Sequence, residues 1–181
     1  MPKQRTLIFP QNDEATFEKF HPSSNPIAFE FMQNFSEQGN IFCAYLWGNV
    51  GVGKTHLMQA ADTDQNNKNN QSAAYVPLSN LKNISPNICQ ELKDFSLVCL
   101  DDIESICGNK KWEEALFHLY NQLDANQNHL ALSSTLPPKQ LPIHLPDLKS
   151  RLNSSFSIEI HSLSDQEKLT ILKNKAESRG F

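Results

Sequence analysis

The sequence predicts an α/β domain in which a mostly parallel, five-stranded sheet lies between helices. Short apolar runs alternate along the chain with segments of helical periodicity, which is the pattern of such a sheet. A glycine-rich turn joins the first apolar run to a helix, and a later run ends in two aspartates. The 181 residues suffice for one domain with a small appendage.

Five short apolar runs are the expected strands. They cover residues 41–47, 73–78, 96–100, 129–132 and 156–160. The runs at 41–47 and 96–100 are apolar almost throughout, which indicates strands buried on both faces of the sheet.

Five further segments are expected to be helical, because their apolar side chains recur at helical spacing or because capping residues flank them. They cover residues 26–38, 54–61, 86–92, 112–124 and 165–179. Ser24 or Asn25 can cap the first of these helices, which has Pro26 at its first position. Ser164 and Glu167 have the spacing of a capping box at the start of the last one.

Three segments are expected to lack regular structure. Residues 1–25 are polar with scattered phenylalanines and prolines, which predicts an extended arm. The polar run DTDQNNKNNQ (62–71) predicts a loop or a frayed helix end. Prolines at 137, 138, 142 and 146 should prevent regular structure before Asp147.

Composition excludes several classes of protein. No apolar run approaches the roughly 18–20 residues of a membrane helix, and the first ten residues are too polar for a secretory signal. The formal net charge of −4 argues against bulk nucleic-acid binding. The cysteines lack CxxC spacing, which favours buried free thiols over a zinc site: Cys43, Cys89, Cys99 and Cys107. We therefore expect a cytoplasmic protein without a membrane partner.

The glycine-rich turn fits the phosphate-binding pattern G-x4-G-K-[ST]. Three of the six glycines in the chain fall within this turn, so that backbone N–H groups can curl around phosphate oxygens. Lys54 is expected to reach the β- and γ-phosphates, and the Thr55 hydroxyl to bind Mg²⁺. The expected nucleotide-binding residues of the turn and the helix start are Gly48, Asn49, Val50, Gly51, Val52, Gly53, Lys54, Thr55 and His56.

Polar residues end the third and fourth expected strands, at the sheet edge where ligands of open α/β folds bind. Asp101 is expected to hold Mg²⁺ through water, while Asp102 is either a water-activating carboxylate or a structural residue. Thr135 closes the sequence Ser133-Ser134-Thr135. Its hydroxyl would contact the γ-phosphate or the attacking water, or it is an ordinary hydroxyl between strand and loop.

Two weaker signals lie outside this edge. Arg151 is one of only three arginines in the chain and follows a short expected helix. It is either an arginine finger that reaches a phosphate across a subunit boundary or a partner in a surface salt bridge. In the arm, Gln4, Leu7 and Phe9 have a spacing that lets an extended peptide place apolar side chains in pockets of a partner.

The order of these motifs resembles the nucleotide-binding domain of the DnaA-type AAA+ ATPases. The resemblance runs from about Thr16 to Phe181 and rests on the glycine-rich turn, YVPLS (75–79), LVCLDDIE (97–104), ESICG (104–108), WEEALFHLYNQL (112–123), LPPKQLPIHLPDLKSRL (136–152) and SLSDQEKL (162–169). Within this family the chain looks most similar to the DnaA regulatory inactivators, the Hda branch. Asp147 stands where DnaA proper has a second arginine, which favours that branch.

The resemblance implies an AAA+ P-loop core with ADP or ATP and Mg²⁺ as cofactors. It matches Thr135 to the sensor position and Arg151 to the arginine finger, which in that branch acts on ATP bound to DnaA. It places Phe20, in TFEKFHPSSN (16–25), beside the adenine pocket. It also matches Gln4, Leu7 and Phe9 to the peptide that docks on the β-subunit sliding clamp of DNA polymerase III. DnaA and the clamp are therefore the implied partners.

The resemblance also implies a division of the chain into a flexible arm (1–15), the nucleotide-binding domain (16–163) and a first helix towards a lid (164–181). The family continues into a helical lid after the point that corresponds to Phe181, so we expect the lid to be absent or only begun and hydrolysis by the chain itself to be weak. No helix-turn-helix pattern occurs, so no sequence-specific DNA binding is expected. The implied function is inhibition of replication initiation. A self-contained initiator or helicase-loader ATPase, a clamp-binding adaptor without nucleotide activity, and homo-oligomerisation stay open.

Overall fold

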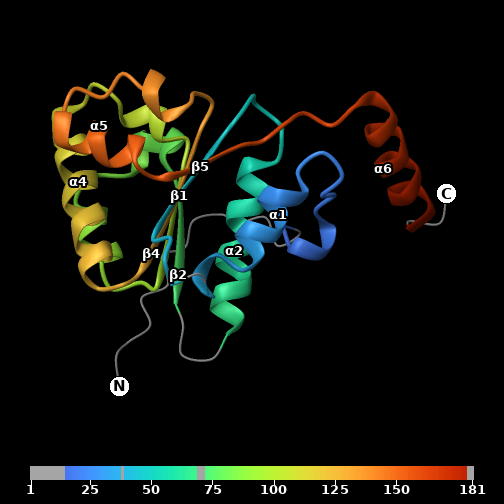
Figure 1. Ribbon diagram of the computed structural model, residues 1–181, viewed down its shortest axis with the longest axis horizontal. Helices are drawn as coiled ribbons and strands as arrows, with labels where there is room; N and C mark the ends of the chain where they lie inside the picture. Colours follow the sequence, from blue (N-terminus) through green and yellow to red (C-terminus); the bar gives the residue numbers. More distant parts are fainter. Residues whose placement is uncertain (1–14, 38, 69–71, 179–181) are drawn as a thin grey trace.

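The structure is a computed structural model that describes residues 15–37, 39–68 and 72–178. Its centre is a parallel sheet of five strands, as the sequence predicts, and the strands lie in the order β2-β3-β4-β1-β5 (Figure 1). The strands are β1 (Cys43–Trp47), β2 (Ala73–Pro77), β3 (Leu97–Asp101), β4 (His129–Ser134) and β5 (Phe156–Glu159).

Two hydrophobic clusters cover the two faces of the sheet, because successive strand side chains point to opposite sides. In β1, Tyr45 belongs to one cluster, and its neighbours Ala44 and Leu46 belong to the other. The first cluster packs under α3 (Ile88–Leu92), α4 (Lys110–Ala125) and α5 (Pro146–Asn153), and the second under α1 (Pro26–Gln33) and α2 (Lys54–Asn67). Figure 1 shows these two groups of helices on opposite sides of the strands.

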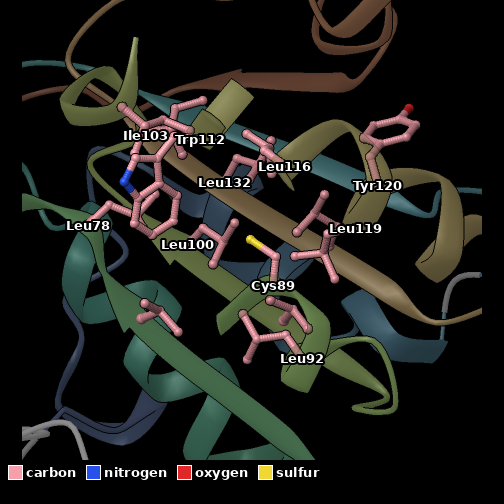
Figure 2. Packing of buried hydrophobic residues seen from close by; sticks show 14 of the residues in the cluster. Leu78, Cys89, Leu92, Leu100, Ile103, Trp112, Leu116, Leu119, Tyr120 and Leu132 are labelled. Atoms are coloured by element: carbon pink, nitrogen blue, oxygen red, sulfur yellow. The ribbon is translucent and has the colours of Figure 1, made fainter. Parts of the chain in front are cut away.

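Helix α4 supplies much of the first cluster. Its buried side chains recur every three or four residues: Trp112, Leu116, Leu119, Tyr120 and Leu123. Figure 2 shows Trp112, Leu116 and Leu119 packed among the other side chains of this cluster. Burial of such side chains contributes roughly 1.5–3 kcal/mol each to folding. The regular spacing explains why this helix is close to its prediction over residues 112–124.

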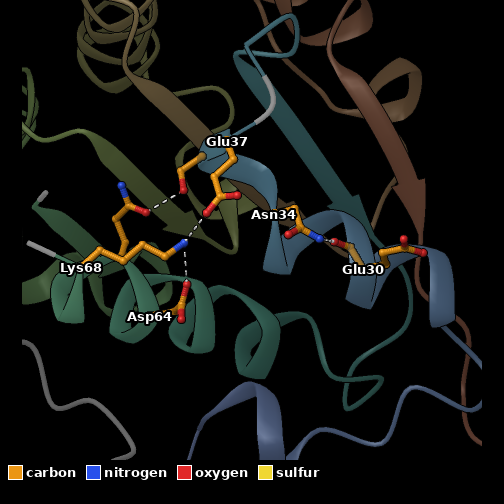
Figure 3. A network of polar contacts seen from close by, with 7 residues as sticks. Glu30, Asn34, Glu37, Asp64 and Lys68 are labelled. Atoms are coloured by element: carbon orange, nitrogen blue, oxygen red, sulfur yellow. Dashed lines mark hydrogen bonds and ion pairs between the residues drawn. The ribbon is translucent and has the colours of Figure 1, made fainter.

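The prediction of a loop or a frayed helix end is wrong for residues 62–67 of the polar run, because α2 continues to Asn67, while residues 69–71 lie outside the described residues. Asp62 and Gln65 are buried, and Gln65 accepts a hydrogen bond of 2.6 Å from the Ser36 hydroxyl. Lys68 then forms ion pairs with Glu37 and Asp64 (Figure 3). Gln65 and Lys68 find partners on the segment after α1, so a run that lacks an apolar face is still held as a helix.

The prediction of an extended arm up to residue 25 is also wrong for its described part. Ala15 and Phe17 are buried, and Phe17–Lys19 (η1) forms a short 3₁₀ turn. Asn25 precedes α1 without capping it. Its side chain instead donates to the carbonyl of His161 and accepts from the N–H of the same residue. The segment before α1 is therefore fastened to the chain that follows β5.

The proline-rich run contains more regular structure than predicted. Pro138–Gln140 (η5) is a 3₁₀ turn, and α5 begins at Pro146, where the missing N–H is tolerated in the first turn. Arg151 consequently lies inside α5 rather than after a helix.

The last helix, α6 (Asp165–Ser178), begins with the predicted capping box. The N–H of Ser164 donates to Glu167, and the N–H of Glu167 donates to the Ser164 hydroxyl. All four cysteines are free, as predicted; three are buried and Cys107 is partly exposed. In the described part of the chain, no helix has the length and apolar character needed to span a bilayer.

Candidate functional site

The residues predicted to bind phosphate and Mg²⁺ meet at the carboxyl edge of the sheet. The turn of residues 48–53 connects β1 to α2, Asp101 ends β3, and the polar residues after Leu132 end β4. Because the strands are parallel and adjacent, their carboxyl ends bring these side chains together, as ligand sites in open α/β folds require.

The backbone of the turn depends on glycine at two places. Gly53 has a φ of 107°, and a Cβ there would lie 2.9 Å from a ring carbon of Phe20. A Cβ at Gly48 would collide with the carbonyl oxygen of Ile160. Both positions combine an unusual backbone conformation with a close neighbour, so side chains are excluded. Within the turn, Val52 is buried and Val50 is exposed.

The side chain of Lys54, the residue directly after the turn, reaches back into the turn. Its ammonium group donates to the carbonyl oxygens of Gly48 at 2.7 Å and Asn49 at 2.9 Å, and the residue is 5% exposed. A buried ammonium group needs such oxygen partners. The turn is thus already shaped around a positive charge, and this arrangement fits a phosphate-binding loop.

Asp101 is held by three hydroxyl donors from three different elements. Thr55 at the start of α2 and Tyr75 in β2 each donate to it at 2.7 Å, and Ser133 in β4 is the third donor. Burial and the charge of Asp101 raise the pKa of Tyr75, so its phenol stays protonated and donates. A hydroxyl beside an oriented carboxylate is the donor set expected for Mg²⁺ bound together with phosphates, so these residues fit the predicted ion.

The role of Tyr75 was not predicted. It lies in the second expected strand, where an aromatic residue by itself indicates only burial. A tyrosine on a strand that pairs with a strand ending in an aspartate is the pattern that could have predicted this hydrogen bond.

Asp102 and Thr135 lie in a second polar group next to Asp101. Asp102 has a φ of 60°, and its N–H donates to the Ser133 hydroxyl at 3.0 Å. Burial, Asp101 and Glu104 together raise the pKa of the Asp102 carboxyl. Thr135 donates its N–H at 2.9 Å and its hydroxyl at 2.8 Å to one oxygen of Glu104, a residue that sequence reasoning missed.

The segment before α1 closes the other side of the turn. His56 contacts the carbonyl oxygen of Thr16 at 2.8 Å, and the ring of Phe20 lies 5.5 Å from the His56 ring and 5.7 Å from that of Phe29. A cavity of about 290 Å³ lies here, lined by Ala15, Gly51, Gly53, Lys54, Thr55, His56 and Gln59. The predicted grouping of Phe20 and His56 with the turn therefore has a geometric counterpart.

Arg151 lies elsewhere. It is exposed in the last turn of α5, with its guanidinium carbon 5.6 Å from the centre of the Tyr120 ring. Helix α5 packs on the face of the sheet opposite α2. The structure therefore does not group Arg151 with the helix that follows the phosphate-binding turn. Gln4, Leu7 and Phe9 lie outside the described residues.

Comparison with known proteins assigns the chain to a family. The model of the bacterial DnaA ATPase domain matches residues 11–161. The chain belongs to this family. It is 37% identical over 182 residues to an uncharacterized protein of Haemophilus influenzae, with 100% of this chain and 78% of that relative covered.

Solved DnaA structures share the fold of this DnaA-type domain. AMPPCP-bound DnaA from Aquifex aeolicus is 25% identical, with a TM-score of 0.77 over 92% of this chain and 56% of that one. Domain III of Thermotoga maritima DnaA has a TM-score of 0.81 at 21% identity, covering 94% and 77% of the two chains. The DnaC helicase loader shows a more distant likeness in fold, with a TM-score of 0.58 at 17% identity over 81% and 97%.

The chain thus spans just over half of the Aquifex DnaA chain. It is a DnaA-like AAA+ ATPase domain related to replication initiation proteins, and it shares its fold with the DnaC helicase loader. Family members with solved structures bind an adenine nucleotide analogue.

Proposed function

We propose that the protein is an Hda-like regulator that binds adenine nucleotide in its own phosphate-binding turn and stimulates ATP hydrolysis on DnaA through Arg151. The observation that carries the proposal is the position of Arg151. It is exposed on α5, and α5 packs on the face of the sheet opposite α2. A planar guanidinium that is exposed at the surface suits a phosphate on another molecule.

The protein's own site serves to bind nucleotide and order the fold. Lys54 would exchange its two carbonyl partners for phosphate oxygens, and Thr55 with Asp101 would hold Mg²⁺. When bound there, the nucleotide and its ion would supply charges that Lys54, Thr55 and Asp101 can hold. The hydroxyl of Tyr75 keeps the Asp101 carboxylate oriented in this arrangement.

In the complex, Arg151 would approach the γ-phosphoryl group of ATP on DnaA and stabilise the negative charge that develops on its oxygens. An arginine supplied in this way is worth about 10³–10⁵ in rate in other phosphoryl-transfer systems. The arm with Gln4, Leu7 and Phe9 would tether the domain to the DNA-loaded sliding clamp. Tethering raises the local concentration of the domain near DnaA without a new contact between the two.

The test is the rate of ATP hydrolysis by DnaA with loaded clamp and this protein. Arg151→Ala should remove most of the stimulation, whereas Lys149→Ala, which removes an exposed cation from the same helix, should keep it. Full stimulation by Arg151→Ala would overturn the finger assignment. No stimulation by the unaltered protein would overturn the regulator proposal.

The clamp contact is tested separately by retention of the protein on loaded clamp. Gln4→Ala with Leu7→Ala should lose retention, while Gln11→Ala in the same segment should keep it. Unchanged retention of the double variant would remove the clamp from the proposal. ATP hydrolysis by the protein alone, lost in Asp102→Asn, would instead favour a self-contained ATPase.

A further inference from the structure

Helices α4 and α5 pack on the same face of the sheet, and Figure 1 shows α5 lying across one end of α4. They touch through polar or charged groups at two places that are two turns apart on α4. Near its start, Glu113 contacts the chain that enters α5, and further along, Tyr120 contacts Arg151 near the end of α5. Helix α4 therefore contacts both the chain that enters α5 and the Arg151 side chain near the end of α5.

Glu113 is the first of these contacts. Its carboxylate is 1% exposed and accepts from the N–H groups of Gly108 at 2.8 Å, His144 at 3.0 Å and Leu145 at 2.8 Å. Burial of a carboxylate is costly unless hydrogen bonds compensate for it. Here backbone donors from two loops fill that need, so the residues directly before α5 are fixed to α4.

Tyr120 is the second contact. Its side chain lies at the margin of the hydrophobic cluster and is 5% exposed (Figure 2). The Arg151 guanidinium carbon lies 5.6 Å from the ring centre, within the range of a cation–π interaction. Burial raises the pKa of Tyr120 to about 12, so the ring carries no charge of its own near neutral pH.

The middle of α5 is fixed by its apolar residues. Leu148 and Leu152, on either side of Arg151 in the helix, are 0% and 1% exposed. The helix axis is therefore held by packing, the helix start by Glu113, and the arginine head group by an aromatic ring. An exposed arginine without such support loses rotamer entropy when it engages a partner.

We propose that Glu113 and Tyr120 are positioning residues for Arg151: α4 holds the start of α5 and the guanidinium in the orientation that Arg151 needs on the partner's nucleotide. This inference rests on the proposed function, because it assigns these residues to the action of Arg151 in trans. It extends that function from one residue to a unit of two helices.

Tyr120 is tested by the maximal rate of DnaA-bound ATP hydrolysis. Tyr120→Leu removes the ring, and the rate should fall about two- to fivefold, the factor that corresponds to an exposed cation–π contact. Tyr120→Phe keeps the ring and should retain most of the rate. The protein concentration that gives half of the maximal effect should not change, because Tyr120 orients Arg151 rather than binding DnaA.

A double-mutant cycle separates this role from a structural one. In the Arg151→Ala background, Tyr120→Leu should have no further effect on the rate, because its effect acts through Arg151. An equal loss in both backgrounds, or no loss in either, would overturn the positioning role of Tyr120. If Arg151→Ala itself has no effect, the finger assignment fails, and this inference fails with it.

Glu113→Gln tests the start of α5. The amide keeps the shape but faces backbone N–H donors with an NH₂ group, so α5 should shift and the maximal rate should fall about tenfold or more. Glu114→Gln, the next residue on α4, is the matched control and should keep the rate. A Glu113→Gln protein that is folded, binds nucleotide normally and stimulates fully would overturn the anchor. If Glu113→Gln does not fold, the Tyr120 variants decide the inference.

Discussion

Removal of the Tyr75 hydroxyl should destabilise the protein more than removal of the Tyr45 hydroxyl. Both tyrosines are buried in strands of the sheet: Tyr75 in β2 is 4% exposed, and Tyr45 in β1 is 0% exposed. The Tyr75 hydroxyl donates to the Asp101 carboxylate at 2.7 Å, whereas that of Tyr45 donates to the Leu136 carbonyl at 2.8 Å. The two Tyr→Phe changes thus remove the same hydroxyl group, but the hydrogen bonds that are lost have different acceptors.

The acceptor sets the expected magnitude. A hydrogen bond to a charged group contributes about 1.5–3 kcal/mol, and a neutral one about 0.5–1.5 kcal/mol. Asp101 keeps Thr55 and Ser133 as donors after the change, so its remaining charge stays partly compensated. We therefore expect Tyr75→Phe to lower the free energy of unfolding by about 2 kcal/mol and Tyr45→Phe by about 1 kcal/mol.

Urea unfolding followed by circular dichroism measures both losses. With an m-value of about 2 kcal/mol per M, the midpoint of Tyr75→Phe should lie about 0.5 M below that of Tyr45→Phe. Equal m-values would show that the comparison is made between similar unfolded states. If the two midpoints coincide, or if Tyr75→Phe is the more stable variant, the carboxylate is not the stronger acceptor and the reasoning fails.

Three more predictions use the same measurement. Gly53→Ala should lose more stability than Gly51→Ala: both positions have positive φ, worth about 1–2 kcal/mol, but only at Gly53 would the Cβ meet a ring carbon at 2.9 Å. The pKa of Asp102 is raised in the folded state, so the stability of the protonated carboxyl group is fully present below its ordinary pKa of 3.8 and is lost as the pH rises. Asp102→Asn should therefore have a higher free energy of unfolding than the unaltered protein at about pH 7 and the same one at about pH 3. Leu132→Ala should cost about 2–5 kcal/mol because the side chain is fully buried, whereas Leu172→Ala, at 63% exposure, should stay within about 0.5 kcal/mol; a similar loss in both would contradict the assigned core.

Much of the site could be predicted because its parts are local. The glycine spacing before Lys54 and the aspartates after an apolar run are patterns within a few residues. The rule that parallel strands share a carboxyl edge then places Asp101 beside Thr55, and their oxygens lie 2.7 Å apart. The alternation of apolar runs and helical segments likewise predicts the sheet and its covering helices.

Two of the wrong predictions share one cause, which is a polar residue whose partner is distant in sequence. Gln65 looks like part of a loop until Ser36 is placed beside it. Asn25 looks like a helix cap, but His161 takes both of its hydrogen bonds.

The sequence by itself determined the parallel sheet, the order of strands and helices along the chain, and the phosphate-binding turn, because apolar periodicity and glycine placement act over short distances. Only the tertiary structure decided which polar groups meet across strands and helices. It placed the Tyr75 hydroxyl on Asp101, Glu104 on Thr135, and α5 with Arg151 on the face opposite α2. Hydrogen bonds and charges at these places satisfy buried groups from elements far apart in the chain, and no local pattern encodes such pairings.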